Sequence, residues 1–309
     1  MFSLIKAVTM PQKELEEYYK KRRREKFTKN NGIPKHIKIH DFWNFLLVCG
    51  VSLFRILSGV NLTVCKDDRK STDRPIVYAC AHVEYFDVEA AFEVIKQPCW
   101  LMLGDARELY KSFDGFMLSL NGVIHLDTLD KEDRHIAKET AVQLLKNGGN
   151  LLIFPEGAWN TTENLPVMKL FCGSAEIAIR THADIIPMAI EKCGNHIYAF
   201  VGENISSDNY ALEDKHLLTE ILRNKIAELR WNCWEEIGMC KRKDFPDNYG
   251  EIFLRKILES VKGYTYTYQD ILDTMFNDKN IVTYQKAFEH LDYIKPCINN
   301  AFLFNKRLK

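Results

Sequence analysis

A histidine and an aspartate stand five positions apart just after an apolar run, in the segment AHVEYFD that contains His82 and Asp87. On one continuous helix, side chains at that spacing would point about 140° apart. The two side chains can therefore meet only if His82 lies in a loop and Asp87 lies in the first turn of the following helix. In that geometry Asp87 accepts a hydrogen bond from one ring nitrogen, and the other nitrogen can act as a general base.

The same spacing has a structural explanation, in which His82 is satisfied within the fold and Asp87 caps a helix. The spacing alone leaves both interpretations open. The chain contains no Gly-x-Ser-x-Gly segment that would supply a serine nucleophile. If His82 is a base, the hydroxyl that it activates is expected to belong to a substrate.

A second segment with chemical potential is FPEG, residues 154–157, which follows the short apolar run at residues 151–153. Proline and glycine alone would explain a turn at the end of a strand. The segment ends the strand abruptly with a carboxylate. Glu156 is a candidate functional residue because of the order of the motifs along the chain: His82 and Asp87 come first, then FPEG, then residues 185–190.

In this order along the chain, the motifs resemble those of the glycerolipid acyltransferases typified by lysophosphatidic acid acyltransferase. The matching stretches are AHVEYFD, GVIHLDT (122–128), FPEGA and IIPMAI (185–190), within residues 75–205. The resemblance implies that His82 deprotonates the acceptor hydroxyl and that Asp87 orients it. It also implies that Phe154, Pro155, Glu156 and Gly157 position the acceptor or the histidine loop. The implied acyl donor is a thioester, acyl-CoA or acyl carrier protein, with no metal and no cofactor.

The sequence departs from the family pattern at two positions where arginine is usual. Thr128 follows the aspartate of the second motif, and Trp159 stands in the loop after FPEG. Because arginine binds phosphate in a bidentate manner, these changes make a phosphorylated acceptor less certain. Arg107 is the leading replacement, with Arg134 and Lys169 as weaker candidates. Trp159 could stack on a sugar acceptor, or could simply be a core or membrane-facing residue.

Alternating strand and helix patterns surround these motifs. Strands are predicted at residues 76–80, 100–103, 123–126, 151–154, 185–190 and 197–201, and helices at 88–95, 131–146, 173–181 and 212–237. This alternation predicts an α/β fold, with a mixed, largely parallel sheet covered by helices on both faces. We expect an N-terminal membrane-associating helical segment over residues 1–70, an acyltransferase α/β domain over 71–240, and a helical C-terminal extension over 241–309.

The N-terminal segment combines a basic block, residues 20–26, with an apolar run at residues 41–62. The basic block lies in a predicted helix over residues 11–27 and is expected to face an anionic membrane surface, although it could be a solvated helix face. The apolar run is near the length of a spanning helix but is diluted by polar residues. We expect a helix that lies in the bilayer interface, with a buried core helix as the alternative.

The composition limits the classes of partner and compartment. The formal net charge is zero, with 42 basic and 42 acidic residues, which argues against a nucleic-acid partner. The nine cysteines are scattered, which predicts reduced thiols rather than disulfides or a zinc site. No secretory signal is expected. Combined with these features, the resemblance implies a peripheral or monotopic acyltransferase on the cytoplasmic face of the cell membrane, which acylates 1-acyl-glycerol-3-phosphate to phosphatidic acid. The alternatives are a glycolipid or sugar acceptor, or a non-catalytic membrane-binding homologue.

Overall fold

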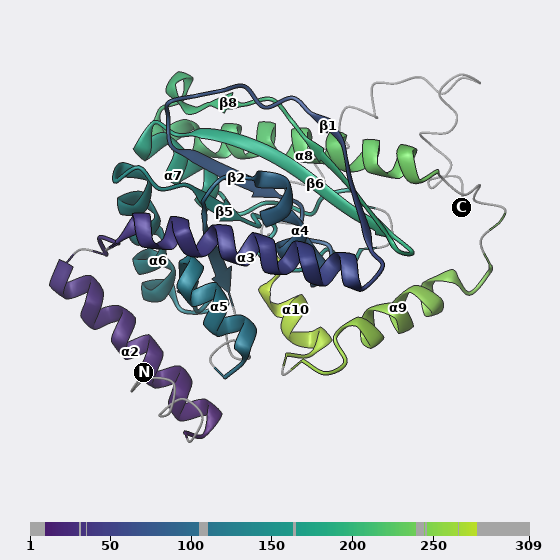
Figure 1. The fold of residues 1–309 in the computed structure, drawn as a ribbon, viewed down its shortest axis with the longest axis horizontal. Coiled ribbons are helices and arrows are strands. Elements are labelled where there is room, and N and C mark those ends of the chain that lie inside the picture. The colour runs from purple at the N-terminus through teal and green to yellow at the C-terminus, as the bar shows by residue number, and fades with distance from the viewer. Residues whose placement is uncertain are drawn as a thin grey trace, which may run out of the picture. The chain divides into compact units, whose positions relative to one another are not determined.

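The structure is a computed structural model that describes residues 10–30, 32–34, 36–104, 111–162, 165–238, 244, 246–264 and 266–276. Eight strands form one sheet in the order β1-β7-β6-β2-β5-β3-β4, with β8 beside β6. Figure 1 shows the fold as a ribbon. The strands are β1 Asn61–Asp67, β2 Ile76–Cys80, β3 Trp100–Gly104, β4 Val123–Leu126, β5 Leu151–Ile153, β6 Asp184–Cys193, β7 His196–Val201 and β8 Ile205–Ser206.

The sheet is mixed and largely parallel. The strand β2 pairs in parallel with β5 and β6, and β3 pairs in parallel with β5 and β4. Only β7 and β8 run antiparallel to β6. Both faces of β2 are buried, in keeping with its continuous apolar sequence IVYAC. The parallel strands β2, β5, β3 and β4 therefore end at the same edge of the sheet, where their following loops meet.

Helices cover both faces of the sheet. Their bounds are α2 Gln12–Asn30, α3 Ile37–Leu57, α4 Phe86–Ile95, α5 Phe113–Asn121, α6 Lys131–Lys146, α7 Gly173–Thr181, α8 Lys215–Ile237, α9 Tyr249–Ser260 and α10 Tyr268–Thr274, with the short 3₁₀ helices η1 Ser207–Asn209 and η2 Leu212–Asp214. Val77 and Ala79 of β2 pack in one apolar cluster with α6, α7 and α8. Tyr78 and Cys80 face the opposite way and pack with α3, α4 and α5. The predicted fold class is confirmed.

The helix α3 packs through one stripe and exposes the other. Of its 21 residues, only Asn44 and Leu47 are buried. Arg55 is bound to the buried Glu93 of α4 by a hydrogen bond of 2.9 Å from Nε to Oε1. The outer stripe carries large exposed apolar side chains, namely Ile39, Phe42, Phe45, Leu46, Leu53, Ile56 and Leu57. The alternative of a buried core helix is therefore wrong. Among the described residues, α3 is the one helix long and apolar enough to cross a membrane.

From the sequence we expected the basic block of α2 to face outward, toward a membrane surface. Part of it instead faces the protein. Lys20 Nζ lies 2.6 Å from Asp130 Oδ2, and Arg23 Nη2 lies 2.6 Å from Asp133 Oδ2. Arg24 Nη2 lies 2.7 Å from Glu132 Oε2. The cause is the acidic first turn of α6, which the positive end of that helix favours. Three cations of the block are thus neutralised by carboxylates of the same chain.

Candidate active site

His82 and Asp87 meet at the carboxyl end of the central strand β2. His82 lies in the loop after β2, and Asp87 lies in the first turn of α4. His82 Nδ1 is 2.9 Å from Asp87 Oδ2, and the Asp87 side chain is fully buried. The carboxylate fixes the plane of the imidazole ring through Nδ1, and Nε2 is then the nitrogen that can exchange a proton with a substrate.

Asp87 also holds the backbone of the loop that carries the histidine. Its Oδ2 accepts hydrogen bonds from the backbone N–H groups of Val83 at 2.6 Å and Glu84 at 3.3 Å. The other oxygen, Oδ1, is buried and has no hydrogen-bond partner among the described residues. A carboxylate that is shielded from water interacts strongly with a neighbouring positive charge, and Asp87 would therefore stabilise the imidazolium form of His82. Asp87 therefore both orients His82 and fastens the turn before α4, whose N-cap residue Tyr85 makes no side-chain capping bond.

The imidazole of His82 remains accessible. Its side chain is 16% exposed, so a small reacting group can reach it. The ring of Phe154 lies against it with a centroid distance of 4.5 Å, and the edge of Trp159 approaches with a centroid distance of 6.3 Å. Two aromatic walls thus limit the directions from which a substrate can approach.

Glu156 of the FPEG segment binds two loops of this chain. Its Oε1 accepts from the backbone N–H of His82 at 2.9 Å, and its Oε2 accepts from the backbone N–H of Met168 at 2.8 Å. Burial raises the pKa of the Glu156 carboxyl, whereas these two N–H groups act to lower it. With both oxygens engaged inside the protein, Glu156 holds the histidine loop, which is one of the two roles implied by the resemblance.

The rest of the FPEG loop is also fastened to its surroundings. Gly157 has a φ of +74°, and a Cβ added there would lie 2.5 Å from Cε2 of Phe171. The carbonyl of Pro155 accepts from the N–H of Phe171 at 2.9 Å. Further on, the N–H of Asn160 donates to the carbonyl of His82 at 2.7 Å. A side chain at position 157 would therefore both strain the turn and displace an aromatic ring.

Two arginines of α8 support the loop that donates to Glu156. Arg223 donates to the carbonyls of Val167 at 3.0 Å and Met168 at 3.2 Å. Arg230 donates to the carbonyl of Pro166 at 2.7 Å. A chain of hydrogen bonds thus runs from α8 through Met168 and Glu156 to the backbone of His82. These arginines were not predicted as supporting residues. The available signal was that both fall on the apolar stripe of the predicted helix over residues 212–237.

Of the predicted phosphate-binding positions, Thr128 lies away from this core. Thr128 follows β4, three strands away from β2, which corresponds to about 14 Å across the sheet. Arg134 Nη1 donates to the carbonyl of Thr128 at 2.5 Å, so a cation does lie beside the position of the usual arginine. Lys169 lies over the ring of Phe276 at 4.8 Å. Arg107 lies outside the described residues.

Trp159 is 9% exposed and is enclosed by residues near the C-terminal end of the described chain. Tyr264 and Tyr266 contact it edge-on, with centroid distances of 5.9 Å and 5.3 Å. A ring enclosed in this way presents little open surface for stacking on a sugar. The structural interpretation of Trp159, as a core residue, is the one that the packing supports.

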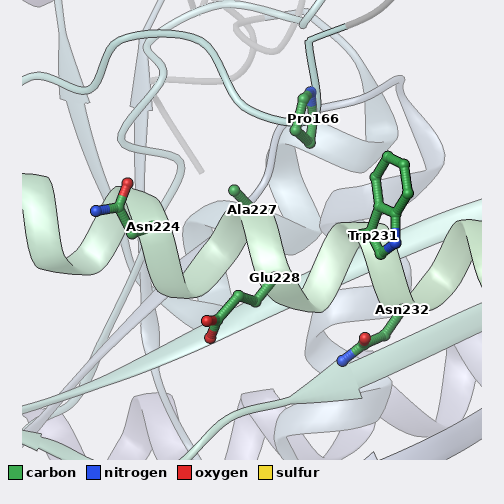
Figure 2. Close-up of a pocket in the computed structure, with 6 residues that line it drawn as sticks. All are labelled: Pro166, Asn224, Ala227, Glu228, Trp231 and Asn232. Carbon is green, nitrogen blue, oxygen red and sulfur yellow. The ribbon is translucent and has the colours of Figure 1, made fainter. Parts of the chain in front are cut away.

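A separate depression of about 350 Å³ lies on the outer side of α8 (Figure 2). It is lined by Pro166, Asn224, Ala227, Glu228, Trp231 and Asn232. None of the motif residues lines it, and no histidine or cysteine is among its lining residues. Within the described residues no cluster of three or more histidine, cysteine or acidic side chains is arranged to hold a metal ion.

Comparisons with known proteins find one family model and two similar proteins. Residues 61–191 match the family model named Acyltransferase. Over 124 residues the chain is 23% identical to the Arabidopsis thaliana protein "1-acyl-sn-glycerol-3-phosphate acyltransferase LPAT1, chloroplastic", a match that covers 40% of this chain and 34% of that protein. The chain therefore spans about a third of the length of this curated relative.

The fold is similar to that of a solved structure, the "1-acyl-sn-glycerophosphate (LPA) acyltransferase, PlsC, from Thermotoga maritima". The TM-score is 0.50 at 14% sequence identity, and the similarity covers 78% of this chain and 89% of that one. Residues 61–191, which match the family model, contain the His82–Asp87 pair and the FPEG loop, which lie side by side at the edge of the sheet. Over residues 61–191 the chain thus matches the Acyltransferase family model, in agreement with the resemblance of its motifs to those of the glycerolipid acyltransferases.

Proposed function

We propose that this protein is a membrane-associated O-acyltransferase that transfers a fatty acyl group from a thioester to a lipid hydroxyl. The proposed acceptor is 1-acyl-glycerol-3-phosphate, and the product is then phosphatidic acid. The observation that carries the proposal is the 2.9 Å contact between His82 Nδ1 and Asp87 Oδ2 beside the FPEG loop, within a segment that matches the Acyltransferase family model.

In the proposed reaction, Nε2 of His82 removes the proton of the acceptor hydroxyl, and the oxygen attacks the thioester carbonyl. A tetrahedral intermediate forms and collapses as the carbon–sulfur bond breaks. The imidazolium then returns its proton to the departing thiolate. Asp87 stabilises the transient positive charge, and Glu156 keeps the backbone of His82 in place. The balance of this reaction needs only a hydroxyl acceptor and an acyl thioester, either acyl-CoA or acyl carrier protein.

The outer stripe of α3 supports a membrane location for this reaction. Ile39, Phe42, Phe45, Leu53 and Ile56 are each more than half exposed. An apolar stripe of this kind on an amphipathic helix is typical of proteins that lie in the bilayer interface. The seven cysteines that the structure describes are unpaired, which fits the reducing cytoplasmic side. We therefore propose a monotopic or peripheral association with the cytoplasmic face.

The decisive experiment measures thiol release from palmitoyl-CoA in the presence of lysophosphatidate. We expect the wild-type protein to turn over and His82→Ala to lose at least about a thousandfold in kcat, because both the base and its orientation are lost. The substitution should leave the circular dichroism spectrum and the melting temperature nearly unchanged. An active, folded His82→Ala protein would refute the mechanism.

The same assay distinguishes the acceptor classes. Thr128 and Trp159 stand where the family usually has arginine, which is the observation that favours an uncharged acceptor. Activity with a glycolipid or a sugar but none with lysophosphatidate would establish that alternative. Vesicle binding with no turnover on any acceptor would instead indicate a non-catalytic homologue.

A further inference from the structure

We propose that Lys256 selects acceptors that carry an anionic head group. Lys256 lies on α9, outside residues 61–191, which match the family model. This inference rests on the acyltransferase function proposed above and names a specificity-determining residue for it. The two helices α9 and α10, with the residues between and just after them, are called the C-terminal segment below and cover residues 249–276. They belong to the same compact unit as the sheet.

The C-terminal segment is held against the FPEG loop by an apolar cluster. Val261 and Ile271 of the segment are buried there together with Ala158, Trp159 and Met168. Met168 is the residue whose N–H donates to Glu156. The segment therefore packs on the same loops that hold the catalytic histidine, and its position is fixed relative to them.

Aromatic contacts extend this packing toward His82. Tyr266 contacts Trp159 at 5.3 Å, and Trp159 in turn approaches the ring of His82 at 6.3 Å. At the other end, Phe276 contacts Phe171 at 5.1 Å, and Phe171 covers Gly157. The C-terminal segment therefore reaches the loops around His82 through Trp159 and Phe171.

Lys256 places a cation at the catalytic loop. Its Nζ lies 3.7 Å from Oε1 of Glu84, a residue of the His82–Asp87 loop whose N–H donates to Asp87. The next residue, Ile257, is buried, and this turn of α9 is therefore anchored while the ammonium group stays in solvent. The Lys256 side chain is 69% exposed.

The pair between Lys256 and Glu84 is weak enough to exchange partners. A separation of 3.7 Å is too long for a hydrogen bond, and an ion pair whose lysine is largely exposed contributes little stability. A phosphate offers more negative charge and more acceptor oxygens than a single carboxylate. In 1-acyl-glycerol-3-phosphate the phosphate is borne on the carbon next to the hydroxyl that reacts. A hydroxyl placed at His82 would therefore bring that phosphate close to the catalytic loop, where Lys256 can bind it.

The test compares an anionic acceptor, lysophosphatidate, with an uncharged one, monoacylglycerol, at a saturating palmitoyl-CoA concentration. We expect Lys256→Ala to raise the KM for lysophosphatidate about tenfold, the effect of losing one charge-assisted hydrogen bond. The KM for monoacylglycerol should stay within twofold. Lys256→Arg should restore the wild-type KM, and Lys262→Ala, which removes an exposed charge from the same segment, serves as the matched control.

A second variant separates head-group recognition from a merely structural ion pair. If Lys256 only anchors α9 through Glu84, Glu84→Gln should raise the KM for lysophosphatidate as Lys256→Ala does. If Lys256 binds the head group, Glu84→Gln removes a competing anion, and the KM for lysophosphatidate should stay unchanged or fall.

Two results would overturn the inference while the proposed function survives. They are an equal rise in KM for both acceptors in Lys256→Ala, and a rise in KM for lysophosphatidate in Glu84→Gln. If the wild-type protein turns over no acceptor at all, the proposed function fails, and this inference fails with it.

Discussion

Glu156 shows how one side chain can determine the position of a base that it does not touch directly. Its two oxygens bind the backbone N–H groups of His82 and Met168, which lie on different loops. Each hydrogen bond involves a charged acceptor, and such bonds are about twice as strong as bonds between neutral groups. The carboxylate is therefore a bridge between the histidine loop and the loop supported by α8.

Replacing Glu156 with glutamine tests this bridging role. The amide keeps one acceptor oxygen but places an NH₂ group against a backbone N–H, so one buried donor loses its partner. We expect the free energy of unfolding to fall by about 2 kcal/mol and kcat to fall about a hundredfold with little change in KM. Urea titration and steady-state kinetics measure the two effects.

The control for this variant is Glu228→Gln, which removes an exposed carboxylate from α8. It should change neither quantity. A Glu156→Gln protein with wild-type kcat would contradict the bridging role, because the position of His82 would then be independent of the carboxylate.

At this scale the sequence predicted which residues meet, but not what holds them. The five-residue spacing of His82 and Asp87 restricts the geometry so strongly that only a loop followed by a helix satisfies it, and the structure has that arrangement. The contribution of Met168 is a backbone N–H, which has no sequence signature. Lys256 lies 172 positions after its partner Glu84 and in a segment without motifs.

At the scale of elements, the contact between α2 and α6 is electrostatic. Arg23 binds both oxygens of Asp133, with Nε to Oδ1 at 3.0 Å and Nη2 to Oδ2 at 2.6 Å. Asp133 is fully buried and also accepts from the N–H of Asp127. Lys20, together with the backbone N–H groups of Asp133 and Glu132, lowers the pKa of Asp130 to about 2. The side-chain contribution of α2 to buried apolar packing is small, since Leu15 is its one buried residue.

Arg23→Ala is expected to destabilise the protein by about 3 kcal/mol, because it leaves the buried charge of Asp133 without its bidentate partner. Arg22→Ala removes a neighbouring exposed charge and should have an effect below about 0.5 kcal/mol. Both values can be measured by urea denaturation. Equal effects of the two substitutions would show that the pairing with Asp133 does not stabilise the fold.

The elements that periodicity could identify were predicted well, and those that depend on distant partners were not. The helix over residues 131–146 and the strand over residues 76–80 have the predicted bounds, because Asp130 caps the helix and the strand is continuously apolar. By contrast, β1 was missed. Its sequence NLTVCKD is half exposed, and its strand conformation depends on pairing with β7, which lies more than 120 residues later. The pairing of the α2 cations with α6 is a long-range contact of the same kind.

At the scale of the whole molecule, the outer stripe of α3 exposes large apolar side chains to solvent, which is unfavourable in water. Phe42 is 59% exposed and Leu53 is 58% exposed on this stripe, three turns apart. On the inner side, Asn44 binds Asn121 of α5, and Ser52 binds Glu93 of α4. The polar contacts of α3 are thus directed into the protein, and the apolar side chains of its outer stripe point away from it.

The double substitution Phe42→Asp and Leu53→Asp should release the protein from vesicles. Each side chain contributes about 1.5–3 kcal/mol when it moves from water into lipid, so partitioning should fall by at least a hundredfold. Co-sedimentation with phosphatidylglycerol vesicles measures this loss. Leu212→Asp, which alters an exposed apolar side chain of η2, should leave sedimentation unchanged. Full retention of the double variant on vesicles would exclude α3 as the docking surface.

The sheet has a practical consequence for anyone who would shorten this protein to its recognisable part. The match to the family model begins with β1 and ends at residue 191. However, β1 pairs with β7, which lies beyond that end at residues 196–201. A fragment of residues 61–191 would leave the edge of β6 that pairs with β7 without its partner strand. It would also lack Arg223 and Arg230, which donate hydrogen bonds to the carbonyls of residues 166–168. The residues that match the family model are therefore fewer than those needed for a complete sheet and its supports. A minimal expressed fragment must extend through Ile237, the end of α8.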